Sequence, residues 1–153
     1  MSQAFSSWKF TRFFTLYAIA SLGAYFTISF TIPAWLMYLF VLVPFYVICI
    51  LYLLNFSLKH RQEKIKCQRL PLYLSGIFQL LIVLTSPASC YGWKQGQACY
   101  SFIQAHLTTD SLTTFQNPTP HWSIVEFMFP IAVLLYIISV AIALKKISID
   151  VLS

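Results

Sequence analysis

The residues whose types could take part in chemistry lie in one polar stretch, residues 87–122, of an otherwise apolar chain. Cys90 and Cys99 in this stretch are separated by eight residues, and Gly92 and Gly96 between them allow the chain a tight return. Thiols that face away from the cytoplasm usually oxidise. We therefore predict a Cys90–Cys99 disulfide that closes the loop, with a stabilisation of about 2–3 kcal/mol in the chain-entropy treatment.

A redox role for these cysteines is the alternative to a structural one. Thiol–disulfide exchange normally uses a Cys-x-x-Cys pair, and the chain contains no such pair. Cys49 falls in an apolar run and Cys67 in a basic one, so neither is placed to pass electrons to the loop. The chain resembles membrane disulfide oxidoreductases only in its outline as a small protein with four apolar runs.

A metal site is a second alternative for the same region. His106 and Asp110 are four residues apart and share a face if the segment is helical, and His121 and Glu126 follow. Two imidazoles and two carboxylates could bind a divalent cation. None of these spacings matches a recognised ligand motif. We therefore expect no cofactor and keep the four residues as a candidate set only.

The composition indicates the kind of protein that carries this loop. Apolar residues make up 59% of the 153 residues and charged residues 9%, against about 45–50% and about 25% in soluble domains. A globule of this size cannot bury so much apolar surface, so the lipid bilayer is expected to surround it. The formal charge of +6 sits at the ends of the apolar runs rather than on one groove-sized face, which argues against nucleic acid as a partner.

The predicted fold is all-α, an integral membrane bundle of four transmembrane helices in a single membrane domain, residues 1–153. About 20 apolar residues cross the hydrocarbon core as a helix, and Pro33 separates the first two runs by so little that they must form a tight hairpin. Residues 98–107 are expected to form a short surface helix. The predicted segments are spans at 13–32, 34–54, 71–86 and 123–144, a cytoplasmic basic loop at 55–70 and the outer loop at 87–122.

The basic residues predict which side each segment faces. Residues 59–69 carry five of the ten Lys and Arg residues, and basic loops stay in the cytoplasm. With four spans, nine of the ten lie on that side and Lys94 alone lies on the other. We therefore predict cytoplasmic N- and C-termini and an extracytoplasmic loop, in a bacterial plasma membrane or in a thylakoid or other organellar equivalent.

Two features of the spans are expected to serve helix packing. One face of the first span carries small residues, which would let another helix approach closely. That helix would belong either to the same bundle, which we favour, or to a partner subunit. Gln79, near the centre of the third span, is expected to hydrogen-bond to a neighbouring helix. The small-residue face consists of Ala20, Gly23, Ala24 and Thr27.

The predicted function is non-catalytic: an accessory, assembly or interaction subunit of a membrane complex. The spans lack the several ionisable groups that transport or intramembrane catalysis needs, whereas the outer loop is long and aromatic, as recognition loops often are. The expected partner is a membrane protein or a second copy of the chain. The alternatives are an oxidoreductase that uses the outer loop and a small oligomeric transporter or channel.

Overall fold

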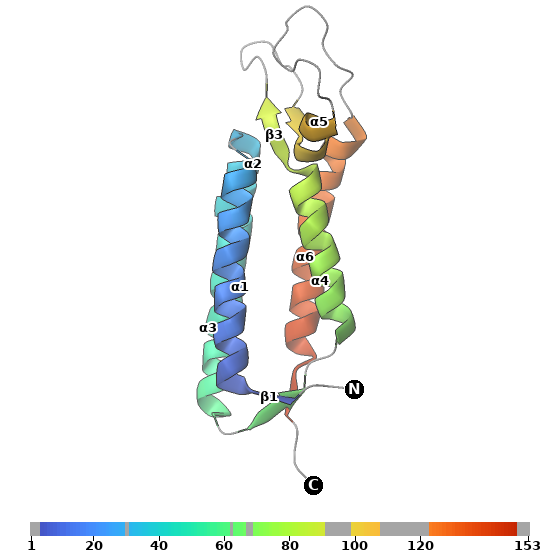
Figure 1. The fold of residues 1–153 in the computed structure, drawn as a ribbon. Coiled ribbons are helices and arrows are strands. Elements are labelled where there is room, and N and C mark those ends of the chain that lie inside the picture. The colour runs from blue at the N-terminus through green and yellow to red at the C-terminus, as the bar shows by residue number, and fades with distance from the viewer. Residues whose placement is uncertain are drawn as a thin grey trace, which may run out of the picture.

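The long helices of the protein lie side by side in one elongated body (Figure 1). The computed structural model describes residues 4–29, 31–61, 63–66, 69–90, 99–107 and 123–149. Most of these residues are helical, as predicted. The helices are α1 (Ser7–Ile28), α2 (Ile32–Met37), the π-helix η1 (Tyr38–Leu42), α3 (Val43–Lys59), α4 (Arg69–Thr85), α5 (Phe102–Leu107) and α6 (Ser123–Lys145).

A proline shapes the rod that α2, η1 and α3 form together. Pro44 has no backbone N–H, and its ring would collide with the carbonyl four residues earlier in a regular helix. The preceding turn widens, and the N–H of Val43 bonds to the carbonyl of Tyr38, five residues back. The helix therefore continues through the proline to Lys59, beyond the end predicted at Leu54.

The helices pack as two pairs. Helix α1 runs against η1 and α3, and α4 runs against α6, while α3 also meets α6. Buried residues from both pairs form one continuous core cluster. The structure thus joins segments far apart in the sequence along most of the length of the body (Figure 1).

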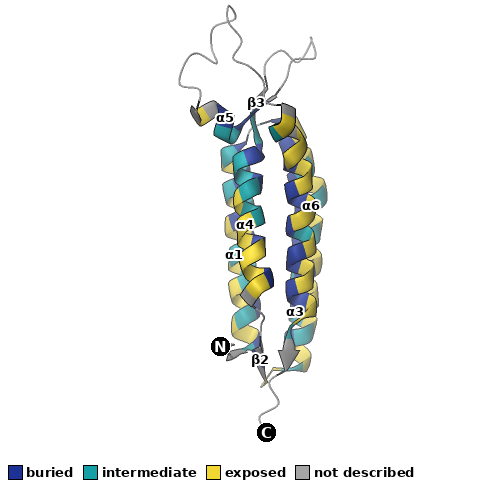
Figure 2. Ribbon diagram, turned by 90° about the vertical axis from the view of Figure 1, so that its right-hand side faces the viewer, coloured by how far each residue is buried: buried dark blue, intermediate teal, exposed yellow. Residues whose placement is uncertain are grey.

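The outward surface of the helices carries many large apolar side chains. Figure 2 shows exposed stretches on the outer sides of the long helices and buried ones on the inner sides. The exposed side chains include Phe40, Leu58, Tyr73, Ile124 and Phe127. A soluble protein does not normally leave an apolar surface of this extent in water.

Two helices are long and apolar enough to span a membrane. They are the 28-residue helix Ile32–Lys59 and the 19-residue segment Phe127–Lys145. In the most apolar part of each, 28% and 44% of the residues are buried, so neither is an enclosed core helix. Leu70–Thr85 is a shorter apolar helix.

Two small sheets, which the sequence did not predict, lie at the two ends of the body. At one end β1 (Ala4–Ser6), β2 (Lys64–Lys66) and β5 (Ser148–Ile149) form an antiparallel sheet in the order β1-β2-β5. At the other end β3 (Pro87–Cys90) pairs antiparallel with β4 (Cys99–Ser101). Strands this short carry almost no alternating pattern of apolar and polar residues, so they escape a search for periodicity.

The helix ends also differ from the predicted boundaries. Helix α1 begins at Ser7 and ends at Ile28, whereas the predicted segment covered residues 13–32. Helix α5 begins at Phe102, because residues 99–101 belong to β4 rather than to the predicted surface helix. The predictions followed the uncharged runs, but a helix can continue past a charge at its end when that side chain faces outward, as exposed Lys9 does.

Candidate functional site

The β3–β4 pair brings the predicted disulfide positions together. In its register the backbone of Cys90 lies directly opposite that of Cys99. No disulfide is found within the described part of the chain, where the free cysteine is the buried Cys49. The disulfide therefore stays a prediction.

The predicted metal ligands are only partly within the described residues. His106 is exposed on α5, where its ring lies 4.2 Å from the ring of Phe102 and its Nδ1 is 3.0 Å from the Phe102 carbonyl. Glu126 lies in the first turns of α6. Asp110 and His121 lie outside the described residues. Among the residues that the structure does describe, no three His, Cys, Asp or Glu side chains gather as a metal site.

A hydrogen-bonded group of side chains connects all the long helices at mid-length. Tyr17 on α1 donates to Oε1 of Gln79 on α4 at 2.5 Å, and its oxygen is 2.9 Å from the hydroxyl of Tyr136 on α6. The Tyr136 hydroxyl is 2.6 Å from that of Tyr46 on α3. Gln79 Nε2 donates to Ser21 on α1 at 2.8 Å. We call Tyr17, Ser21, Tyr46, Gln79 and Tyr136 the polar core cluster.

Burial makes these bonds important for the stability of the fold. Tyr46 and Tyr136 are almost fully buried, and a buried hydroxyl without a partner is costly. Their hydroxyls instead satisfy each other, and Tyr136 contacts both Tyr17 and Tyr46. From the sequence we singled out Gln79 but not the tyrosines. Tyr46 and Tyr136 lie near the middle of their apolar runs rather than at the ends, where tyrosine is enriched in membrane helices, whereas Tyr17 lies near the start of its run.

A second polar group joins the helices near the β3–β4 end. The hydroxyls of Ser29 and Thr31, in the turn before α2, both donate to the carbonyl of Pro87, at 2.7 Å for Thr31. The hydroxyls of Tyr38 and Ser86 are 2.6 Å apart. The turn between the first two predicted spans is thereby fixed to the segment that follows α4.

One buried tyrosine close to these groups has a hydroxyl without a hydrogen-bond partner among the described residues. Tyr25 is fully buried and stacks on Tyr38 with ring centroids 5.2 Å apart. Its hydroxyl finds no partner within the described part of the chain. It therefore provides an internal comparison for the tyrosines of the polar core cluster.

The polar core cluster is chemically suited to holding helices together. Phenols, a carboxamide and an alcohol can donate and accept hydrogen bonds in a fixed network. They include no carboxylate, imidazole or thiolate that could serve as base or nucleophile near neutral pH. The geometry therefore favours a structural role for this cluster.

The small-residue face predicted for helix packing is mostly exposed within the described part of the chain. Ala20, Gly23 and Thr27 are exposed and Ala24 is half-buried, and a Cβ built on Gly23 would meet no atom within 4 Å. The buried residues of α1 are instead Ser7, Thr11, Ala18, Ser21 and Tyr25. Residue size alone could not reveal which side of the helix faces the core, because both sides of α1 carry small residues.

Comparison with known protein families, with curated proteins and with solved structures finds no match for this chain.

Proposed function

We propose that the chain is a small multi-pass membrane protein that acts as a non-catalytic accessory, assembly or interaction subunit of a membrane complex. The observation that carries the proposal is the open face of α1. Ala20, Gly23 and Thr27 are exposed on a helix whose opposite face is fully used in the core. Close helix–helix approach in a membrane favours such small residues, so a helix of a partner or of a second copy is the expected occupant.

Four spans are the topology that we propose, with both termini cytoplasmic. The support is that α1, the rod from α2 to α3, α4 and α6 lie side by side with apolar outward surfaces (Figures 1 and 2). The sheet β1-β2-β5 also places the basic segment Lys64–Lys66 beside both terminal strands. Basic residues and both ends of the described chain would then share the cytoplasmic side.

We also propose that Cys90 and Cys99 form a disulfide on the other side. Directly opposed residues of an antiparallel pair have Cα atoms about 4.5–5.5 Å apart. A disulfide requires a Cα separation of about 4.4–6.8 Å. The register of β3 with β4 supports the bond for this reason. The oxidoreductase, metal and transport alternatives gain no comparable support from the described residues.

The test is whether the chain stays in a larger complex when the open face of α1 is filled. We expect Gly23→Leu to release the chain from its native complex, seen as faster migration in native electrophoresis after mild detergent extraction. The Leu side chain would collide with a closely packed helix, but has open space within this chain. Two differently tagged copies distinguish a homo-oligomer from a complex with another protein.

The matched control is Gly76→Leu on α4, where a Cβ also meets no atom within 4 Å. It should leave the complex intact, because Gly76 is not on the α1 face. Unchanged migration of Gly23→Leu would contradict the proposed docking face. Modification of Lys64 or Lys66 by an impermeant reagent on intact cells would contradict the proposed sidedness.

A further inference from the structure

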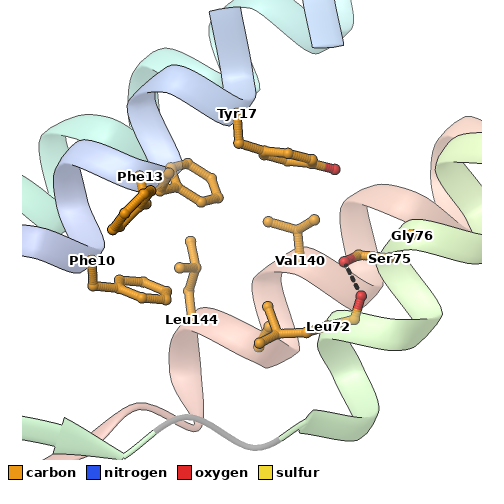
Figure 3. A pocket seen from close by; sticks show the side chains of 10 residues that line it. Phe10, Phe13, Tyr17, Leu72, Ser75, Gly76, Val140 and Leu144 are labelled. Carbon is orange, nitrogen blue, oxygen red and sulfur yellow. Dashed lines mark hydrogen bonds between the residues drawn. The ribbon is translucent and has the colours of Figure 1, made fainter. Parts of the chain in front are cut away.

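A pocket of about 250 Å³ lies between α1, α4 and α6, in the half of the body that ends at β1-β2-β5 (Figure 3). Its floor is formed by buried Val140 and Leu144 of α6. Phe13 of α1 and Leu72 of α4 stand at its sides and are themselves exposed, by 66% and 42%. The pocket is therefore reached from the side, between two outward helix surfaces.

The lining of the pocket is apolar almost throughout. Its polar side chains are Tyr17, whose hydroxyl is bonded to Gln79 and Tyr136, and Ser75, which donates to the Leu72 carbonyl at 2.8 Å. Both hydroxyl protons are thus used within the chain, so neither residue is left to donate to a polar ligand. The volume is below the range of about 300–1,000 Å³ typical of sites for whole small ligands. The pocket thus suits part of an aliphatic chain.

Each wall of the pocket continues, one turn further, to a basic residue. Lys9 is four residues before Phe13 on α1, and Arg69 is three before Leu72 on α4. Lys146 is three after Ala143, and its backbone N–H still bonds to Ile142 at 3.0 Å, so the helical path extends to it. Residues three or four apart on a helix share a face, so exposed Lys9 and Lys146 bring two cations to the same end.

Few described negative charges are present at this end to pair with these cations. The carboxylate of Glu63 is 3.0 Å from Nδ1 of His60 and so has a partner of its own. Lys9 and Lys146 are exposed and form no ion pair in the part of the chain that the structure describes. This end therefore presents positive charge beside an apolar pocket that opens sideways.

We infer that the pocket binds one acyl chain of an anionic glycerophospholipid, whose phosphodiester headgroup lies beside Lys9 and Lys146. The inference rests on the proposed membrane location, which places these cations at the cytoplasmic headgroup level. Because bulk lipid is as apolar as the pocket, burial of the acyl chain alone gives the lipid little preference for the pocket over the bilayer. Attraction between the cations and a headgroup of net negative charge, which a zwitterionic headgroup lacks, supplies it, at about 1 kcal/mol or roughly fivefold in affinity per cation.

Native mass spectrometry of the purified full chain tests the inference. The probe is an equimolar mixture of phosphatidylglycerol and phosphatidylcholine with identical acyl chains, added to the detergent-solubilised protein. We expect the wild type to retain one phosphatidylglycerol at least fivefold over phosphatidylcholine. Gly76→Leu should abolish retention, because the added side chain has open space at the pocket wall. Replacement of a helical Gly by Leu also favours the helix, so misfolding is not the expected cause.

Two further variants separate the chain from the headgroup. The double variant Lys9→Gln, Lys146→Gln should retain both lipids equally, since the pocket is intact and both charges are gone. Gly23→Leu should bind as the wild type does. Equal retention of the two lipids by the wild type, or unchanged phosphatidylglycerol retention by Gly76→Leu, would overturn the inference.

Failure of the membrane proposal would look different from failure of the lipid site. If alkaline carbonate releases the chain from membranes, the proposed spans are wrong whatever the lipid data show. If the chain resists extraction but discriminates no lipid, only the lipid site is wrong.

Discussion

The two helix pairs are joined differently along their length. At mid-length, Tyr17, Tyr46, Gln79 and Tyr136 link them by side-chain hydrogen bonds. Towards the β3–β4 end, the hydroxyls of Ser29, Thr31 and Tyr38 continue this linkage. Towards the β1-β2-β5 end, a pocket lined by apolar side chains of α1, α4 and α6 takes the place of such bonds (Figure 3).

The difference shows which contacts determine how the two helix pairs associate. Apolar contact between helices in lipid has little advantage over contact with lipid tails, whereas a hydrogen bond between helices fixes both position and rotation. The polar core cluster can therefore hold the pairs in register while the end beyond it stays partly open. A site for a lipid chain can form at that open end without loss of the fold.

The largest expected effect is at the β3–β4 end of the body. If Cys90 and Cys99 are bonded, reduction should lower the free energy of unfolding by about 2–3 kcal/mol, because a loop of eight residues is released in the unfolded state. Thermal unfolding in detergent with and without reductant measures this. Cys90→Ser and Cys99→Ser should each reproduce the reduced value and no longer respond to reductant.

Cys49→Ala is the control for general effects of reductant, since Cys49 is a buried thiol of α3. It should respond to reductant as the wild type does. Alkylation of both Cys90 and Cys99 in native protein without reductant would show that the disulfide does not exist.

An intermediate effect is expected at the centre of the polar core cluster. Tyr136→Phe removes the hydroxyl that contacts both Tyr17 and Tyr46. Hydrogen bonds between membrane helices contribute about 0.6 kcal/mol on average and up to about 1.7, so the loss should be about 1–2 kcal/mol. Denaturant titration in mixed micelles gives the difference in the free energy of unfolding.

Tyr25→Phe is the matched substitution for this comparison. It removes a buried hydroxyl that has no partner among the described residues, so stability should stay the same or rise by up to about 1 kcal/mol. Equal losses for Tyr136→Phe and Tyr25→Phe would mean that ring packing, not hydrogen bonding, joins the pairs.

The smallest effect is expected beside the pocket. Ser75 hydrogen-bonds only within its own helix in the described structure, so Ser75→Ala should change the free energy of unfolding by less than about 0.5 kcal/mol. Ser21→Ala, which removes the acceptor of Gln79, should cost about 0.6 kcal/mol. The same titration compares the two. A larger loss for Ser75→Ala than for Ser21→Ala would reverse the contrast between the two regions.

The positions of the helices could be predicted because long uncharged runs are a strong signal. The first residues of the four runs, Phe13, Ala34, Pro71 and Ser123, all lie in helices, although the first run continues past the end of α1 and the third past the end of α4. Gln79 could be singled out because a carboxamide among apolar residues needs a partner. In each case one property of a few adjacent residues was enough.

The tyrosines could not be found in this way, because their role depends on how separate helices are rotated against each other. Tyr136 is buried between Tyr17 and Tyr46, whereas Tyr52 and Tyr73, in similarly apolar surroundings, are exposed. The exposure of Gly23 could not be predicted for the same reason. Residue type does not report helix rotation when both sides of a helix are apolar.

The sheet β1-β2-β5 has a consequence for how the chain is made. Its central strand, Lys64–Lys66, is synthesised midway through the chain, yet one neighbour, Ser148–Ile149, emerges only after α6. Until then one edge of β2 has no partner from this sheet. The sheet can therefore be completed only after α6 has been made, and a product truncated before Ser148 would carry an open strand edge by which cellular quality control could recognise it.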